Sequence, residues 1–212
     1  MSAYEDYIEK YRKLHTGESL FHTADTGEVL DYGKYKYEFS GVEFTRKFIP
    51  YIEQYIKKVK RSITILDYGC GKGFMPWGPY RDKTHGVWGH FYNSIRAIWL
   101  YDPTNPPYAE RPPEGLQFDV VGAADVLEHI PEESVEYTIR DIDRFTKPDG
   151  LIILSISGIP ALKTFDDGEN LHCTLKDPKW WANTIVRNTK KQFVLIYQGA
   201  DRTTVIPGNI KK

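Results

Sequence analysis

The sequence predicts an α/β fold in which helices cover both faces of a mostly parallel sheet. Short apolar runs alternate with amphipathic stretches, the order that parallel strands joined by crossover helices produce. The run at 151–157 (LIILSIS) is almost wholly apolar, as a strand buried on both faces should be. Near the end of the chain, two further runs around a short polar link, 192–197 and 203–207, predict an antiparallel hairpin.

The first sixty residues predict a helical arm or cap. Apolar and aromatic residues recur at helical spacing over 3–14. Residues 15–40, rich in Gly, Thr, Asp and Tyr, predict an irregular segment that is either a lid over a site or a surface arm. A helix is expected at 42–59 with a kink near Pro50.

The remaining residues alternate between strands and helices. Strands are predicted at 63–66, 97–102, 118–125 and 151–157. Helices are predicted at 131–145, preceded by acidic residues suited to its positive end, and at 177–189. A turn is expected at 148–150, a loop at 158–176 and an insertion at 74–96, with a short helix near 90–94.

Composition excludes several classes of protein. The 212 residues carry a formal net charge of -1, so no overall positive field would attract nucleic acid or an anionic membrane. The N-terminus lacks the apolar core of a signal peptide, and no apolar run is long enough for a membrane span. With two cysteines and no readable disulfide framework, we expect a cytoplasmic protein. The 15 tyrosines indicate a tight core or, alternatively, a cleft lined by aromatic rings.

The most informative motif is the glycine loop DYGCGKG (67–73), which follows an apolar strand directly. Glycines at this point let a ligand approach the backbone where a side chain would clash. The spacing differs from the dinucleotide fingerprint and from the phosphate-binding loop. A leading acid, Asp67, would repel a phosphate but suits a ligand with an ammonium group.

Four motifs in this order resemble class I S-adenosylmethionine (SAM)-dependent methyltransferases. They are ILDYGCGKG, Asp102 at the end of the second strand, FDVVGAADVLEHIP and KPDGLIILSIS. The resemblance covers about residues 60–206 and implies a Rossmann-like fold, SAM as cofactor and a SAM-binding domain over 61–212, with 1–60 as its cap in one folding unit. In this superfamily the acid at the position of Asp102 holds the ribose hydroxyls. The cofactor-binding residues implied are Asp67, Tyr68, Gly69, Cys70, Gly71, Gly73, Asp102, Pro103, Asp125 and Val126.

The chain departs from the superfamily pattern in two places. The stretch between Asp67 and Asp102 is long, which indicates an insertion at 74–96 beside the site. The stretch 103–117 is too short and too rich in proline for a helix and a third strand, so the third-strand region is shortened and the usual adenine-side acid has no counterpart. Within the superfamily, DYGCGKG, HGVWG, YDP, DVLEHIPEE and NLHCTLKDPKWW resemble a bacterial and phage group without a known substrate.

The catalytic candidates are His129, His172 and Glu128, because the loops that carry them emerge at the same edge of the sheet. Some polyprenyl-quinone O-methyltransferases that look similar around LEH use such residues with a divalent metal. Alternatively a histidine is a metal-free base, or Glu128 and His129 only cap the next helix and fix the loop. We assign no metal at this point. His85 and His90 are weaker candidates, and one of Trp180 and Trp181 is expected in the core while the other walls the acceptor pocket.

The sequence thus predicts a SAM-dependent methyltransferase that acts on a small-molecule O or N acceptor, with nucleic acid and membrane not expected as partners. Two rivals remain. Asn105-Pro106-Pro107-Tyr108 spells the motif of methyltransferases that act on base amino groups, although here it follows the second strand rather than the fourth. The other rival is a SAM-binding module without catalytic activity.

Overall fold

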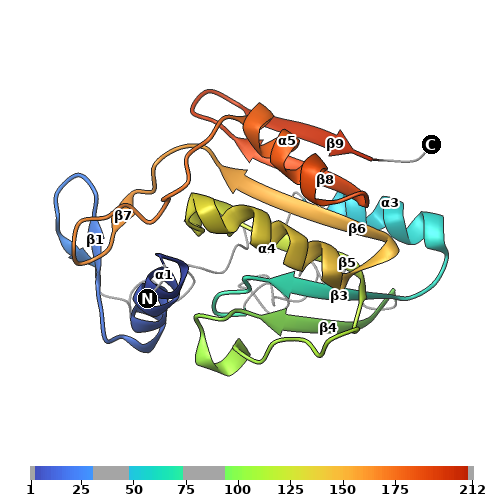
Figure 1. The fold of residues 1–212 in the computed structure, drawn as a ribbon, viewed down its shortest axis with the longest axis horizontal. Coiled ribbons are helices and arrows are strands. Elements are labelled where there is room, and N and C mark those ends of the chain that lie inside the picture. The colour runs from blue at the N-terminus through green and yellow to red at the C-terminus, as the bar shows by residue number, and fades with distance from the viewer. Residues whose placement is uncertain (1–2, 31–47, 74–93, 210–212) are drawn as a thin grey trace, which may run out of the picture.

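The computed structural model describes residues 3–30, 48–73 and 94–209. Within them, a six-stranded sheet has the order β4-β3-β5-β6-β8-β9. The first five strands are parallel and β9 is antiparallel to β8 (Figure 1). The strands are β3 (Ile63–Tyr68), β4 (Ile95–Tyr101), β5 (Phe118–Ala124), β6 (Thr146–Ser157), β8 (Gln192–Gln198) and β9 (Thr203–Gly208).

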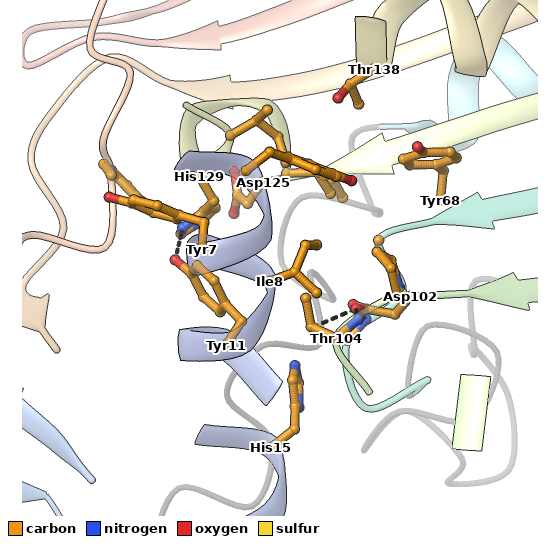
Figure 2. A pocket seen from close by; sticks show the side chains of 18 residues that line it. Tyr7, Ile8, Tyr11, His15, Tyr68, Asp102, Thr104, Asp125, His129 and Thr138 are labelled. Atoms are coloured by element: carbon orange, nitrogen blue, oxygen red, sulfur yellow. Dashed lines mark hydrogen bonds between the residues drawn. The ribbon is translucent and has the colours of Figure 1, made fainter. Parts of the chain in front are cut away.

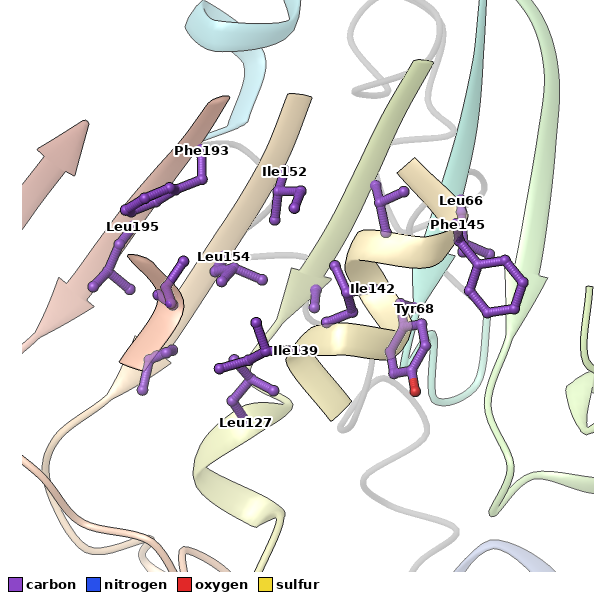
Figure 3. Packing of buried hydrophobic residues seen from close by; sticks show 14 of the residues in the cluster. Leu66, Tyr68, Leu127, Ile139, Ile142, Phe145, Ile152, Leu154, Phe193 and Leu195 are labelled. Carbon is purple, nitrogen blue, oxygen red and sulfur yellow. The ribbon is translucent and has the colours of Figure 1, made fainter. Parts of the chain in front are cut away.

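Helices cover both faces of this sheet. Helices α4 (Glu132–Phe145) and α5 (Pro178–Asn188) lie on one face, and α3 (Ile49–Val59) lies on the other (Figure 1). The strands present alternate residues to the two faces, as the period of two requires. Thus Ile152 and Leu154 pack beneath α4 (Figure 3), whereas Leu151 and Ile153 belong to the cluster that α3 covers.

The local sequence explains where these helices begin. Pro50 lies in the first turn of α3, where its missing N–H costs no hydrogen bond. The Asp177 carboxylate accepts a hydrogen bond from Trp180 N at 2.8 Å and so caps α5. Glu132 and Glu133 occupy the first turn of α4, where negative charge suits the helix dipole.

The N-terminal helix α1 (Ala3–Thr16) lies beside the carboxyl ends of the parallel strands (Figure 1). After it, β1 (Phe21–Thr23) and β2 (Val29–Leu30) form a small antiparallel sheet with β7 (Lys163–Thr164) from the loop after β6. A third apolar cluster joins α1 to this sheet and loop, and its buried members are Leu14, Phe21, Phe165 and Leu171. The N-terminal arm is therefore fastened to the part of the chain that follows β6.

The predicted fold is confirmed, including the C-terminal hairpin and the shortened third-strand region. Between β4 and β5 the only regular element is a single 3-10 turn, η3 (Pro106–Tyr108). No described helix combines the length and apolar character that crossing a bilayer requires.

Several local predictions were wrong. Residues 21–23 and 29–30 form two short strands within the segment predicted to be irregular, and β7 interrupts the predicted loop 158–176. The predicted turn at 148–150 is part of β6, where the register against β5 shifts to accommodate extra residues. Pro50 starts α3 instead of kinking it, and the predicted helical residues 42–47 lie outside the described part of the chain.

Candidate active site

A cavity of about 230 Å³ opens between α1 and the carboxyl ends of β3, β4 and β5 (Figure 2). This is where ligands bind in open α/β sheets. Nine of its lining residues were predicted from the sequence: Tyr68, Gly69, Gly71, Asp102, Pro103, Asp125, Val126, His129 and His172. The predicted site residues Asp67, Cys70, Gly73 and Glu128 are buried directly behind this lining.

The glycine loop needs its glycines for conformation and for space. Gly69, Gly71 and Gly73 all have positive φ, at 74°, 55° and 68°. A Cβ atom on Gly69 would lie 2.4 Å from the Val126 side chain, and one on Gly73 would lie 2.6 Å from the Tyr108 ring. The loop is therefore packed on both sides without room for side chains, and its backbone forms part of the cavity wall.

The Asn-Pro-Pro-Tyr segment buttresses this loop. The Asn105 amide donates a hydrogen bond of 2.7 Å to Gly71 O, and Asn105 is itself buried. The ring of Tyr108 packs against Gly73, while Tyr108 O accepts from Asp102 N at 3.0 Å. The side chains of Asn105 and Tyr108 thus both support the glycine loop.

Asp102 links the end of β4 to the glycine loop. Its Oδ2 accepts a hydrogen bond from Gly71 N at 2.8 Å. Its Oδ1 accepts from Thr104 N at 2.8 Å and from the Thr104 hydroxyl at 2.5 Å (Figure 2). Asp102 lines the cavity, and one acceptor site remains on its Oδ2 for a further donor such as a ribose hydroxyl.

Asp67 is buried beneath the loop, and no described donor reaches its Oδ2. Burial, and then the negative charge of Asp102, raise the pKa of its carboxyl to about 8. Asp102 and Asp125 line the cavity above it, and no Lys or Arg of the described residues does. The site is thus electrostatically suited to a cationic ligand.

Glu128 and His129 belong to a 3-10 turn, η4 (Leu127–His129), between β5 and α4. Glu128 is fully buried, and its Oε1 accepts a hydrogen bond from Ser157 N at 2.7 Å. Burial, and next the charge of Asp125, raise the pKa of the Glu128 carboxyl well above its usual range. Glu128 and His129 do not cap the following helix, because α4 has no side-chain cap, but their hydrogen bonds do fix the neighbouring backbone at Ser157 and Leu171.

The two predicted histidines meet at one end of the cavity. Their ring centroids are 4.7 Å apart, with the planes at 82°. His129 Nδ1 lies 2.9 Å from Leu171 O, and His172 Nδ1 lies 2.6 Å from Ile159 O. A carbonyl oxygen only accepts hydrogen bonds, so each Nδ1 carries the proton and each Nε2 carries the lone pair. Burial lowers both pKa values, that of His129 to about 3, so both rings are neutral at pH 7.

Helix α1 supplies a wall of the cavity that sequence reasoning missed. Its contribution consists of Tyr4, Tyr7, Ile8, Tyr11 and His15. The Tyr11 hydroxyl lies 2.5 Å from His129 Nδ1 and donates to Leu171 O at 3.0 Å, while Ile8 and His15 lie toward the Asp102 end (Figure 2). The available signal was the tyrosine stripe at helical spacing over 3–14, and the sequence left open whether its rings pack in a core or line a cleft.

Other predicted residues lie elsewhere. Trp181 is fully buried, as expected for one of the pair. Trp180 packs edge-on against Trp181 and beneath Lys176 and is not a lining residue, so the prediction that it walls the pocket was wrong. His85 and His90 lie outside the described residues, as does most of the 74–96 insertion.

Comparison with known families decides the class of protein. The model of a family described as a methyltransferase domain matches residues 42–189. The chain belongs to this methyltransferase family. The expectation of a SAM-dependent methyltransferase, with SAM as its cofactor, is thereby confirmed.

A solved structure is similar in fold. It is the 1,6-didemethyltoxoflavin-N1-methyltransferase of Burkholderia thailandensis, crystallised with 1,6-didemethyltoxoflavin and S-adenosylhomocysteine. The two chains are 14% identical, with a TM-score of 0.53 over 92% of this chain and 81% of the other. No curated protein matches the chain. At this identity the likeness supports the fold, and the acceptor has to be argued from the site.

Proposed function

We propose that this methyltransferase transfers a methyl group from SAM to an O or N atom of a small molecule bound in the cavity beneath α1. The observation that carries the proposal is the placement of the glycine loop, Asp102 and the two histidines around one cavity. In a direct transfer, the C–S bond of the sulfonium breaks as the acceptor lone pair bonds to the methyl carbon, and sulfur keeps the electron pair. The protein must align the two reactants and help the acceptor lose its proton.

The cofactor would lie over the glycine loop. Asp102 would accept a hydrogen bond from a ribose hydroxyl, and Asp67 would offset the methionine ammonium charge from beneath. Backbone of Tyr68, Gly69, Cys70, Gly71 and Gly73 would border the ligand, with Pro103, Asp125 and Val126 completing the same wall. The acidic lining supports this assignment, because SAM carries positive charge on its sulfonium and ammonium groups.

The acceptor would occupy the end of the cavity between α1 and the histidines. Tyr7 and Tyr11 offer aromatic surface there, and Glu128, His129 and His172 supply the groups that assist proton removal. The similar Burkholderia enzyme was crystallised with 1,6-didemethyltoxoflavin, which supports a small molecule in this chain too. We also propose the finer kinship with the bacterial and phage group and the division into a cap (1–60) and a SAM-binding domain (61–212).

Isothermal titration of SAM tests the cofactor assignment. We expect binding to the wild type and a loss of about 1–3 kcal/mol in Asp102→Asn if the carboxylate holds the ribose. Thr104→Val keeps that carboxylate but removes one of its local hydrogen bonds, and Asp201→Asn changes an exposed turn. Both controls should bind SAM nearly as the wild type does. Equal losses in Asp102→Asn and Thr104→Val would contradict the ribose assignment.

Mass spectrometry of small-molecule mixtures incubated with SAM tests the activity. A mass gain equal to one methyl group, together with S-adenosylhomocysteine, is the expected result. SAM binding without any turnover, in the wild type and in His172→Ala alike, would favour the non-catalytic module. Methylation of oligonucleotides would favour the base methyltransferase.

A further inference from the structure

Glu128, His129 and His172 form a compact group of potential metal ligands. One donor atom from each residue lies within 4.8 Å of the donor atoms of the other two. Donors bound at 2.0–2.2 Å around one ion stand about 3–3.5 Å apart, so the three side chains would need to close by roughly 1–2 Å.

Both histidines are held as metal-ligating histidines usually are. Such a histidine donates its other ring N–H to a carbonyl or carboxylate, which fixes the tautomer and the ring orientation. Here His129 Nδ1 has Leu171 O and the Tyr11 hydroxyl as partners, and His172 Nδ1 has Ile159 O. Each Nε2 therefore carries a lone pair on a ring that backbone already orients.

Glu128 supplies the anionic partner. Its Oε1 accepts a hydrogen bond from Ser157 N, and its side chain lies beside the carboxyl group of Asp125, which raises the pKa of Glu128. Two acids this close hold a proton unless a cation offsets their negative charge, so a bound metal ion would take the place of that proton. The residue is too deep for solvent to provide that compensation.

We propose that Glu128, His129 and His172 bind one divalent first-row transition-metal ion at the acceptor end of the cavity. Two imidazoles and one carboxylate favour Zn²⁺, Fe²⁺, Co²⁺ or Mn²⁺ over Mg²⁺, which prefers oxygen ligands. Three protein ligands leave a coordination position for another molecule, as in catalytic rather than structural zinc sites. His129 and His172 also line the cavity, so this position would open toward the acceptor.

This site deepens the proposed function and rests on it for its chemical role. An acceptor O–H or N–H bound to a divalent cation releases its proton to solvent more readily, because the cation stabilises the anion that remains. The acceptor lone pair is then available to the methyl carbon of SAM. Metal binding itself, however, can be measured without any acceptor.

The test is a titration of untagged, chelator-treated protein with Zn²⁺, followed by SAM titration of the same sample. We expect one equivalent of Zn²⁺ to bind, and Co²⁺ at the same site to give the visible absorption of nitrogen-ligated cobalt. His129→Ala and His172→Ala should each weaken Zn²⁺ binding at least about 100-fold, more than loss of an outer-shell partner costs. Glu128→Gln keeps the shape of the buried side chain and should also weaken it strongly.

Two further variants distinguish a site from incidental binding. Tyr11→Phe removes an outer-shell partner of His129 and should weaken Zn²⁺ binding about tenfold, within the range known for such partners. His22→Ala removes a histidine of β1 outside the cavity and should bind Zn²⁺ as the wild type does. Circular dichroism confirms that each variant is folded.

The outcomes separate the two proposals. Absence of stoichiometric metal binding in a protein that binds SAM overturns the metal site and leaves the proposed function standing. Zn²⁺ binding that survives unchanged in both His129→Ala and His172→Ala also overturns the site. Failure to bind SAM, with Zn²⁺ binding that depends on the three residues, overturns the proposed function instead.

Discussion

At the scale of single residues, the buried carboxyl group of Asp67 costs the ligand-free protein stability, which indicates a role in ligand binding. It is 3% exposed, and no described donor reaches its Oδ2. Its pKa is raised to about 8 by burial and by Asp102, so at neutral pH the ligand-free protein keeps it protonated. The positive charge of bound SAM would lower the pKa of this carboxyl, so that SAM binding would be coupled to release of a proton from Asp67.

This leads to a prediction on pH and stability. The folded-state pKa lies above the unfolded value of 3.8, so the folded state holds the extra proton between about pH 4 and pH 8. Stability of the ligand-free protein should therefore fall as pH rises through this window, by at most about 1.4 kcal/mol per pH unit from this residue. Asp67→Asn lacks this titration and should lose less stability over the same range.

Urea unfolding of both proteins across the window measures the difference. Asp201→Asn, which alters an exposed residue between β8 and β9, should follow the wild type. Saturating SAM should flatten the wild-type dependence, because a nearby cation lowers the pKa of the carboxyl. Parallel profiles for Asp67→Asn and the wild type would show that Asp67 does not titrate in this way.

At the scale of elements, the glycine loop and η3 behave as one unit. Asn105 donates a hydrogen bond to Gly71 O, and Tyr108 covers Gly73, so the only regular structure between β4 and β5 supports the glycine loop. This use of the Asn-Pro-Pro-Tyr segment differs from gripping a flipped base, which would need both side chains directed at a ligand. The segment follows the second strand because, from there, Asn105 and Tyr108 reach the glycine loop.

Gly73→Ala tests this support. Alanine at φ 68° is strained, and its Cβ would lie 2.6 Å from the Tyr108 ring. We expect a loss of about 2–4 kcal/mol in the free energy of unfolding and a weaker affinity for SAM. Gly168→Ala is the matched control, because φ is 84° there but nothing lies within 4 Å, so only backbone strain of about 1–2 kcal/mol remains.

Equal costs for the two glycine substitutions would mean that the contact with Tyr108 has no energetic weight. Gly73→Ala combined with Tyr108→Ala should recover part of the loss, because the second change removes the clashing ring.

The docking of α1 is a second property at this scale. Lys10 bridges from α1 to Asp167 at 2.6 Å and to Glu169 at 2.7 Å, beside the edge-on contact of Tyr7 with Phe165. Because both carboxylates are about half exposed, the ion pairs contribute modestly, about 0.2–1 kcal/mol each. These ion pairs nevertheless connect α1, which forms one wall of the cavity, to the loop after β6.

Lys10→Met should therefore loosen α1 without unfolding the sheet. Hydrogen exchange of the α1 amides should accelerate about two- to fivefold, while the amides of β5 and β6 remain protected. Lys13→Met is the control, since the ion pair of Lys13 with Glu9 stays within α1 at 4.0 Å. Unchanged exchange in Lys10→Met would show that apolar packing alone holds the helix.

At the scale of the whole molecule, charge and fold point to a small ligand. The formal net charge is -1, and the described lining of the cavity contains carboxylates without Lys or Arg. A net charge close to zero favours a small ligand over nucleic acid, because binding to nucleic acid relies on basic residues that release counterions. A ligand that binds only the folded state stabilises it, by about 2.7 kcal/mol at one hundred times its dissociation constant.

Thermal unfolding should therefore respond to SAM and not to DNA. For a chain of this size we expect saturating SAM to raise the melting temperature by roughly 5–10 °C. A short duplex at low salt should leave the melting temperature unchanged. A DNA-dependent rise that disappears with added salt would contradict the small-molecule assignment.

The sequence by itself determined the sheet, its terminal hairpin and the position of the glycine loop and Asp102 at the strand ends. These follow from local patterns: the apolar runs of the strands, the glycines after Ile63–Tyr68 and the acid at the end of the next strand. Patterns of this kind fail where long-range pairing overrides local preference. Pro148-Asp149-Gly150 therefore lies within β6 instead of forming a turn, and residues 21–23 form a strand because they pair with β7.

Only the tertiary structure decided how the acceptor end is built. Tyr11 and His129 are 118 residues apart in sequence, and the carbonyl groups that fix both imidazole tautomers come from loops brought together by the sheet edge. Sequence periodicity marks α1 as amphipathic but does not say which surface its tyrosines face. That choice depends on the packing of α1 against the loop after β6, where Phe165 and Leu171 bury its apolar face.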